Sequence, residues 1–97
     1  MSPVEILNQP VSHLYPHLIS AGTIGPVCVP NRMIMTGMSA HMAPDAGYAT
    51  DREIAFYERR AVGGVGYIIV GSAFVHPSGT FGAQLGSHHD SLIPAQA

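Results

Sequence analysis

The stretch that decides the fold covers residues 31–41 and reads Asn-Arg-Met-Ile-Met-Thr-Gly-Met-Ser-Ala-His. Its first half holds a short apolar run without alternation, residues 33–35, which is typical of a strand buried on both faces in a parallel sheet. Its second half, residues 36–39, supplies two hydroxyls, a glycine and a thioether. Because ligand sites in parallel α/β folds gather at the carboxyl ends of the strands, we expect a functional rim at residues 36–39.

A helix is predicted over residues 51–62, after a turn at residues 44–47. Thr50 and Glu53 have the spacing of a capping box, in which each side chain can bond to the free backbone N–H of the other residue. Apolar residues then recur at helical spacing, two arginines occupy the last turn, and Gly63-Gly64 provides a left-handed stop.

A second continuous apolar run, residues 65–70, predicts another strand buried on both faces. A strand, a helix and a strand joined by a crossover of this length form a βαβ unit with parallel strands. Residues 71–73 then end the second strand beside residues 36–39, so we expect the two strand ends to form one surface. Residues 74–87 are expected to be a long loop, with a next helix beginning at Asp90 or Ser91.

The segment before the first strand has two parts. Residues 1–14 show no sustained period and are expected to be a loosely ordered leader. Residues 15–30 combine β-branched residues with Gly and Pro, which predicts a short hairpin that turns at Gly25-Pro26. We therefore divide the chain into this leader and one incomplete α/β domain over residues 15–97.

Composition argues against several classes of protein. The chain has 97 residues, no lysine, four arginines and a net charge of −2, which argues against nucleic-acid binding. Its single cysteine, Cys28, cannot form an internal disulfide and, among valines and a proline, is expected to be a buried, inert thiol. No apolar run approaches the roughly 20 residues of a membrane span, and the N-terminus fits no targeting signal, so we expect a cytoplasmic protein.

Two motifs that look like sites have simpler explanations. The glycines of residues 63–66 close a helix and open a strand, whereas a nucleotide fingerprint follows a strand and opens a helix. His88 and His89 are adjacent, and no third ligand lies at metal-site spacing, so we expect no metal.

The residues of the rim allow two interpretations each. His41 lies two residues beyond Ser39 at the functional end, where it either faces a substrate or is an ordinary exposed histidine. Thr36 and Ser39 either face a ligand or cap the strand end. Met38 either lines the site or fills the core.

The predicted βαβ unit is unfinished. One crossover helix leaves both strand edges and one sheet face open, whereas parallel sheets are normally covered on both faces. We therefore expect these residues to be the N-terminal part of a larger parallel α/β protein. The open strand edges are expected to favour self-association.

Taken in order, the motifs resemble those of the old yellow enzyme family, the FMN-dependent NAD(P)H:flavin oxidoreductases, including its 2,4-dienoyl-CoA reductase-like branch. The matching segments are Tyr-Pro-His-Leu at 15–18, Ile-Gly-Pro at 24–26, Asn-Arg-Met-Ile-Met-Thr-Gly-Met-Ser at 31–39, Phe-Tyr-Glu-Arg-Arg-Ala at 56–61, Gly-Gly-Val-Gly-Tyr-Ile-Ile-Val at 63–70 and Gln-Leu-Gly at 84–86. Their order and spacing make the resemblance specific over about residues 15–94.

The resemblance implies a TIM (β/α)₈ barrel that carries FMN at the mouth, of which this chain is the N-terminal portion, about two βα units. It implies that Thr36, Gly37, Met38 and Ser39 line the flavin. Ser39 matches the position at which relatives often place Thr or Cys near the flavin carbonyl O4, and a donor there raises the flavin potential. Ser72 matches a small residue beside the isoalloxazine ring.

The resemblance also implies a reaction. Hydride passes from NAD(P)H through the flavin to an electron-poor alkene. The family's catalytic residues and phosphate loops match nothing here and are expected beyond Ala97, so the chain by itself is expected to be inactive. Gly37 stands where many relatives have Pro or Ala, and His41 stands where some have a substrate-facing Tyr, which leaves the substrate open.

Two alternative functions stay open on the sequence. The first is a non-catalytic, truncated βαβ module that acts only by association with other chains. The second is a phosphate-binding barrel enzyme without flavin.

Overall fold

The computed structural model describes residues 5, 10–44 and 46–97. The expected leader lies largely outside these residues. Within its described part, one-turn helix α2 occupies Val11–Leu14, and a second short helix, α3, follows at Pro16–Ile19.

The predicted hairpin is confirmed. Strand β1 (Gly22–Ile24) pairs antiparallel with β2 (Val27–Val29), and Gly25 makes the turn with a φ of +56°. Since neighbouring residues of a strand face opposite sides, Val29 is buried while Cys28 is exposed. The expected burial of Cys28 is therefore wrong.

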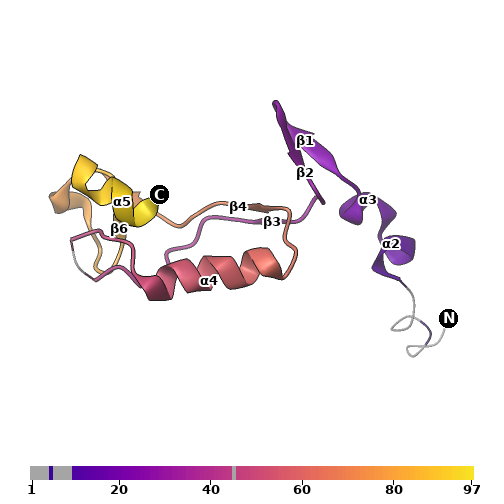
Figure 1. The fold of residues 1–97 in the computed structure, drawn as a ribbon, viewed down its shortest axis with the longest axis horizontal. Coiled ribbons are helices and arrows are strands. Elements are labelled where there is room, and N and C mark those ends of the chain that lie inside the picture. Colours follow the sequence, from indigo (N-terminus) through magenta and orange to yellow (C-terminus); the bar gives the residue numbers. More distant parts are fainter. Residues whose placement is uncertain (1–4, 6–9, 45) are drawn as a thin grey trace.

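The predicted βαβ unit is also confirmed. Strand β3 (Ile34–Met35), helix α4 (Asp51–Val62) and strand β4 (Tyr67–Ile68) follow in order, and Ile34 lies opposite Tyr67 in a parallel pair. Figure 1 shows α4 running along one side of the β3–β4 pair, with the hairpin and the short N-terminal helices extending away from it.

Both ends of α4 follow from local chemistry. At its start, the Thr50 hydroxyl oxygen accepts the Glu53 backbone N–H at 3.2 Å. At its end, Gly64 adopts a φ of +101° and its N–H donates to the Ala61 carbonyl at 3.0 Å. The reciprocal half of the capping box is not formed, because the buried Oε2 atom of Glu53 has no hydrogen-bond partner.

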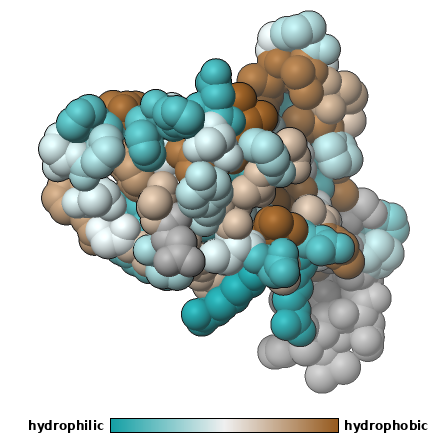
Figure 2. Space-filling model, turned by 60° about the vertical axis from the view of Figure 1, so that its left-hand side comes forward, coloured by the Kyte–Doolittle hydropathy of each residue, from teal (hydrophilic) through white to brown (hydrophobic). Residues whose placement is uncertain are grey.

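The expectation that both strands are buried on both faces is wrong. Ile34 remains 51% exposed and Val70, just after β4, remains 50% exposed, because α4 is the one element that runs along the pair in the described part of the chain. Figure 2 shows apolar side chains on the surface as well, including at the top of the molecule where the hairpin stands. The radius of gyration is 17.6 Å, against about 12–13 Å for a compact domain of this length.

The buried apolar side chains lie mostly in the C-terminal third. The buried set is Val29, Ala43, Phe74, Leu85 and Leu92. Phe74 belongs to β5 (Ala73–Phe74), which pairs parallel with β6 (Leu85–Gly86), and 3₁₀-helix η1 (Pro77–Gly79) lies between them. The segment expected to be only a long loop therefore contains a second short parallel ladder.

The predicted start of a further helix is confirmed. The 3₁₀-helix η2 (Asp90–Leu92) leads directly into α5 (Ile93–Gln96). No helix in the described residues is long and apolar enough to span a membrane.

The unpaired Glu53 carboxyl gives the stability of the chain a pH dependence. Burial raises the pKa of Glu53 from its ordinary value of 4.5, so the folded chain keeps this proton to a higher pH than the unfolded chain does. The contribution of Glu53 to the free energy of unfolding is therefore most favourable below pH 4.5, where the carboxyl is protonated in both states. This contribution is lost as the pH rises through the pKa of the folded chain. Replacing Glu53 with Gln removes this dependence.

Thermal unfolding followed at a series of pH values between about 4 and 7 tests this expectation. The midpoint of the wild-type chain should fall, relative to that of Glu53→Gln, as pH rises. The matched control is Glu58→Gln, an exposed acid on the same helix, whose profile should run parallel to that of the wild type. Parallel profiles for wild type and Glu53→Gln would contradict the assignment.

Candidate functional site

The ends of β3 and β4 meet in backbone contact. The Ile69 N–H donates to the Met35 carbonyl at 2.9 Å, and the same register, continued three residues further, places Met38 beside Gly71. A Cβ atom at Gly71 would overlap the Met38 carbonyl. Residues 36–39 and 71–73 therefore lie together on one side of the sheet, as predicted, and we call them the strand-end rim.

Helix α4 is tied to the strand-end rim by one hydrogen bond. The backbone N–H of Gly71 donates to the Tyr57 hydroxyl oxygen at 2.9 Å. Tyr57 lies in the middle of α4, so the helix that connects the two strands also holds the end of the second one. The sequence predicts Tyr57 on the apolar side of the helix but not this contact.

The first half of the strand-end rim presents free polar groups and an exposed thioether. The Met38 side chain is 61% exposed. Within the described residues, the hydroxyls of Thr36 and Ser39 make no hydrogen bond with the protein. A Cβ at Gly37 would meet the Ile69 side chain at 3.4 Å, an ordinary van der Waals contact.

The second half of the strand-end rim is positioned by a buried amide. The Nε2 atom of Gln84 donates to the Ser72 hydroxyl at 2.8 Å, while its Oε1 atom accepts the Phe81 N–H at 2.6 Å. Gln84 is only 8% exposed. Gln84 belongs to the Gln-Leu-Gly segment that matches the family, but the sequence does not predict its contact with Ser72. The two residues are twelve positions apart and lie on different segments.

His41 lies beyond the strand-end rim in an exposed loop. Its φ of +54° is in the left-handed region, which is uncommon for residues other than glycine and which occurs often at functional sites.

The histidines near the C-terminus have structural contacts. His88 stacks on Phe74 with ring centroids 5.0 Å apart, and the His89 Nδ1 atom accepts the Ser91 N–H at 3.1 Å. Among the described residues, no group of three or more His, Cys, Asp or Glu side chains lies close enough to hold a metal ion.

The sequence profile of one protein family, described as the NADH:flavin oxidoreductase / NADH oxidase family, matches residues 19–97. The chain belongs to this family. Among curated relatives, an NADH oxidase of Thermoanaerobacter brockii is 39% identical over 66 residues, which is 67% of this chain and 10% of the relative. An NADPH dehydrogenase of Clostridium acetobutylicum is 34% identical over 62 residues, 64% of this chain and 18% of the relative.

A metal reductase of Desulforamulus reducens is 38% identical over 77 residues, 79% of this chain and 11% of the relative. The chain thus spans between a tenth and a fifth of the length of these relatives.

A solved structure supports the same family. The old yellow enzyme from Trypanosoma cruzi matches with a TM-score of 0.73 and 28% identity, over 84% of this chain and 22% of that structure. The expected fold class, the N-terminal portion of a TIM barrel in a member of the NADH:flavin oxidoreductase family, is confirmed by this match.

The strand-end rim has the chemistry to hold the ring of a flavin rather than its phosphate. Hydroxyl donors and a thioether suit a flat heteroaromatic ring with carbonyl oxygens. Residues 36–39 and 71–73 contain no Lys or Arg to hold a phosphate.

The contact at Gly71 predicts a specific cost for a methyl group. Gly71→Ala should displace the end of β4 from Met38 and lower the unfolding free energy by about 1–3 kcal/mol, the usual cost of overpacking. Gly79→Ala is the control, since a Cβ there meets no atom within 4 Å. Chemical denaturation of both variants measures the difference, and equal stability of the two would show that the strand ends are not in contact.

Proposed function

We propose that this chain forms one wall of the FMN site in an NAD(P)H-dependent oxidoreductase of the ene-reductase type. The observation that carries the proposal is the contact of Met38 with Gly71, which joins the carboxyl ends of two parallel strands in a member of a flavin oxidoreductase family. In barrels of this kind the active site lies at that end of the strands. Bound FMN would pass hydride from NAD(P)H to an electron-poor alkene, such as an enone or an enoyl thioester.

Five residues of the strand-end rim have a role in this proposal. Ser39 would donate a hydrogen bond to the flavin carbonyl O4, and Thr36, Gly37 and Met38 would line the ring. Ser72 packs beside the ring, with its hydroxyl held by the Gln84 amide. A donor such as Ser39 stabilises negative charge on the ring in a site shielded from water.

His41 is proposed to face the substrate. It follows Ser39 by two residues, and its backbone lies in the left-handed region, where residues at functional sites often occur. The residues that deliver protons and anchor the substrate are proposed to lie in parts of the family's barrel that this chain does not match.

Two further features belong to the proposal. We propose a cytoplasmic location, since the single cysteine gives no disulfide framework. The open edges of the β3–β4 pair favour self-association of the isolated chain.

The role of Ser39 is tested by Ser39→Ala in a family-length protein that carries this sequence. The lost hydrogen bond to a charged acceptor is worth about 1.5–3 kcal/mol, so the flavin midpoint potential should fall while FMN stays bound. Redox titration measures this, with Thr36→Val as the comparison for a hydroxyl lost elsewhere on the strand-end rim. An unchanged midpoint in Ser39→Ala would remove Ser39 from the O4 position.

The isolated chain is proposed to bind FMN weakly and to be inactive. Phosphate in such barrels is commonly held by loops after the seventh and eighth strands, and the strand-end rim supplies no cation in their place. Titration of the purified chain with FMN, followed by flavin fluorescence, should show no tight stoichiometric binding. Tight binding, or measurable NADPH oxidation, would show that these residues suffice.

A further inference from the structure

The hydroxyl groups of the strand-end rim differ in how the protein holds them. Within the described residues, the Thr36 and Ser39 hydroxyls bond to no protein group, whereas the Ser72 hydroxyl oxygen accepts a hydrogen bond from the Gln84 Nε2 atom at 2.8 Å. Ser72 is itself exposed, so a ligand at the rim can reach its hydroxyl. Ser72 therefore carries the hydroxyl whose hydrogen bonding the protein restricts.

The backbone N–H of Phe81 decides which way the Gln84 amide faces. A backbone N–H can only donate, so the amide atom that it meets at 2.6 Å is the acceptor, Oε1. The other polar atom of the amide, Nε2, then faces Ser72, and an amide nitrogen can only donate. A flipped amide would place two donors against each other at Phe81. The direction of the hydrogen bond from Gln84 to Ser72 is thus set by the backbone.

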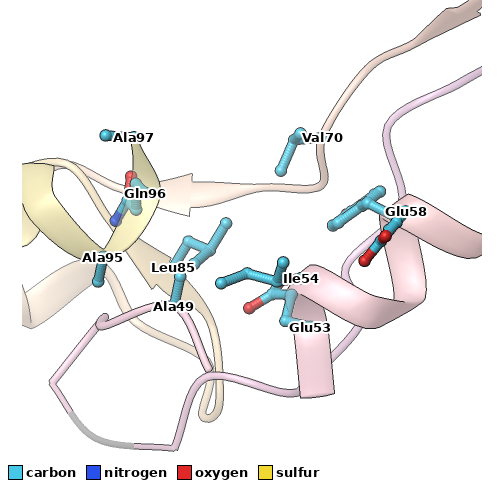
Figure 3. A pocket seen from close by; sticks show the side chains of 10 residues that line it. Ala49, Glu53, Ile54, Glu58, Val70, Leu85, Ala95, Gln96 and Ala97 are labelled. Carbon is cyan, nitrogen blue, oxygen red and sulfur yellow. The ribbon is translucent and has the colours of Figure 1, made fainter. Parts of the chain in front are cut away.

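Gln84 is held in place by burial and by the backbone around it. Its side chain is buried, and so is its neighbour Leu85, which points into the space between α4 and the C-terminal helix α5 (Figure 3). The Gln84 N–H donates to the Gly82 carbonyl at 2.8 Å, and the Ala83 carbonyl accepts the Ala43 N–H at 3.3 Å. Turning the buried amide would break both of its hydrogen bonds, so it keeps this orientation.

The Ser72 hydroxyl carries one proton, and the Gln84 amide nitrogen cannot accept it. Because the Ser72 oxygen already receives the amide proton, its own O–H must be donated elsewhere. In the part of the chain that the structure describes, no protein acceptor takes this proton. Accepting one hydrogen bond also polarises the O–H bond and strengthens it as a donor. Ser72 thus offers a hydrogen-bond donor at the surface of the rim.

We propose that Ser72 donates a hydrogen bond to an acceptor atom of the ring held at the strand-end rim, and that Gln84 is the positioning residue that keeps Ser72 a donor. This inference rests on the proposed function, in which the ring belongs to FMN. The acceptor is a carbonyl oxygen or an unprotonated ring nitrogen. A donor at such an atom stabilises the negative charge of the reduced ring, so the Ser72 hydroxyl raises the flavin potential.

The test measures the flavin midpoint potential in a family-length protein that carries this sequence and is loaded with FMN. Ser72→Ala should lower the affinity for reduced relative to oxidised flavin about tenfold, which is a fall of about 30 mV in a two-electron couple. Gln84→Met keeps the unbranched shape of the side chain, removes the amide and should lower the potential in the same direction. The matched control is Gln96→Met, because the Gln96 amide bonds to the Gly86 carbonyl from the C-terminal helix (Figure 3) and should leave the potential unchanged.

The double variant separates positioning from general structural damage. If Gln84 acts through Ser72, Gln84→Met should lower the potential no further in a protein that already carries Ser72→Ala. Additive shifts would mean that Gln84 acts on the flavin by another route, and would overturn its positioning role. An equal fall in Gln96→Met would overturn it as well.

A measurement without FMN tests the hydrogen bond itself. In ¹⁵N NMR spectra of the 97-residue chain, Ser72→Ala should shift the side-chain amide resonances of Gln84 and speed their exchange with solvent. The side-chain amide resonances of Gln96 should stay in place. Unchanged Gln84 resonances would show that its amide does not bond to Ser72, and the proposal would be wrong.

Failure of this inference is distinguishable from failure of the proposed function. A potential that falls in Ser39→Ala but not in Ser72→Ala would overturn the role of Ser72 and leave the flavin site in place. A family-length protein that binds no FMN would overturn both.

Discussion

The parallel pairing of β3 with β4 is the constraint on which the candidate site depends. A twelve-residue helix joins the strands, so both can run in the same direction, and their carboxyl ends emerge at the same edge. The register then carries Met38 against Gly71, where only a residue without a side chain fits. The Tyr57 hydroxyl fixes the Gly71 amide from the helix, so strand, helix and strand meet at one point of the rim.

The sequence predicts well the features that depend on hydrogen bonds and backbone geometry between residues close together in the chain. Helix α4 begins and ends at the predicted residues, since Thr50 and Gly64 terminate it by local hydrogen bonds and backbone geometry. The turn at Gly25 is equally local. The placement of residues 36–39 beside Gly71 was also predictable, because a helical crossover between two apolar runs permits little else.

The features that the sequence does not predict depend on contacts between distant segments. The apolar run at β4 indicates burial on both faces, but burial requires a second covering layer, which the described residues do not supply. The β5–β6 ladder has two-residue strands, too short for a recognisable period. The supporting roles of Tyr57 and Gln84 likewise depend on partners, Gly71 and Ser72, that spacing alone cannot identify.

NOE spectroscopy on the isotopically labelled chain can show whether the two strand ends form one surface. NOEs are expected between Gly71 and both Met38 and Ser39, together with cross-strand NOEs that pair Ile34 with Tyr67 in a parallel pattern. An antiparallel pattern, or the absence of any NOE from Gly71 to residues 38–39 in a folded chain, would contradict it.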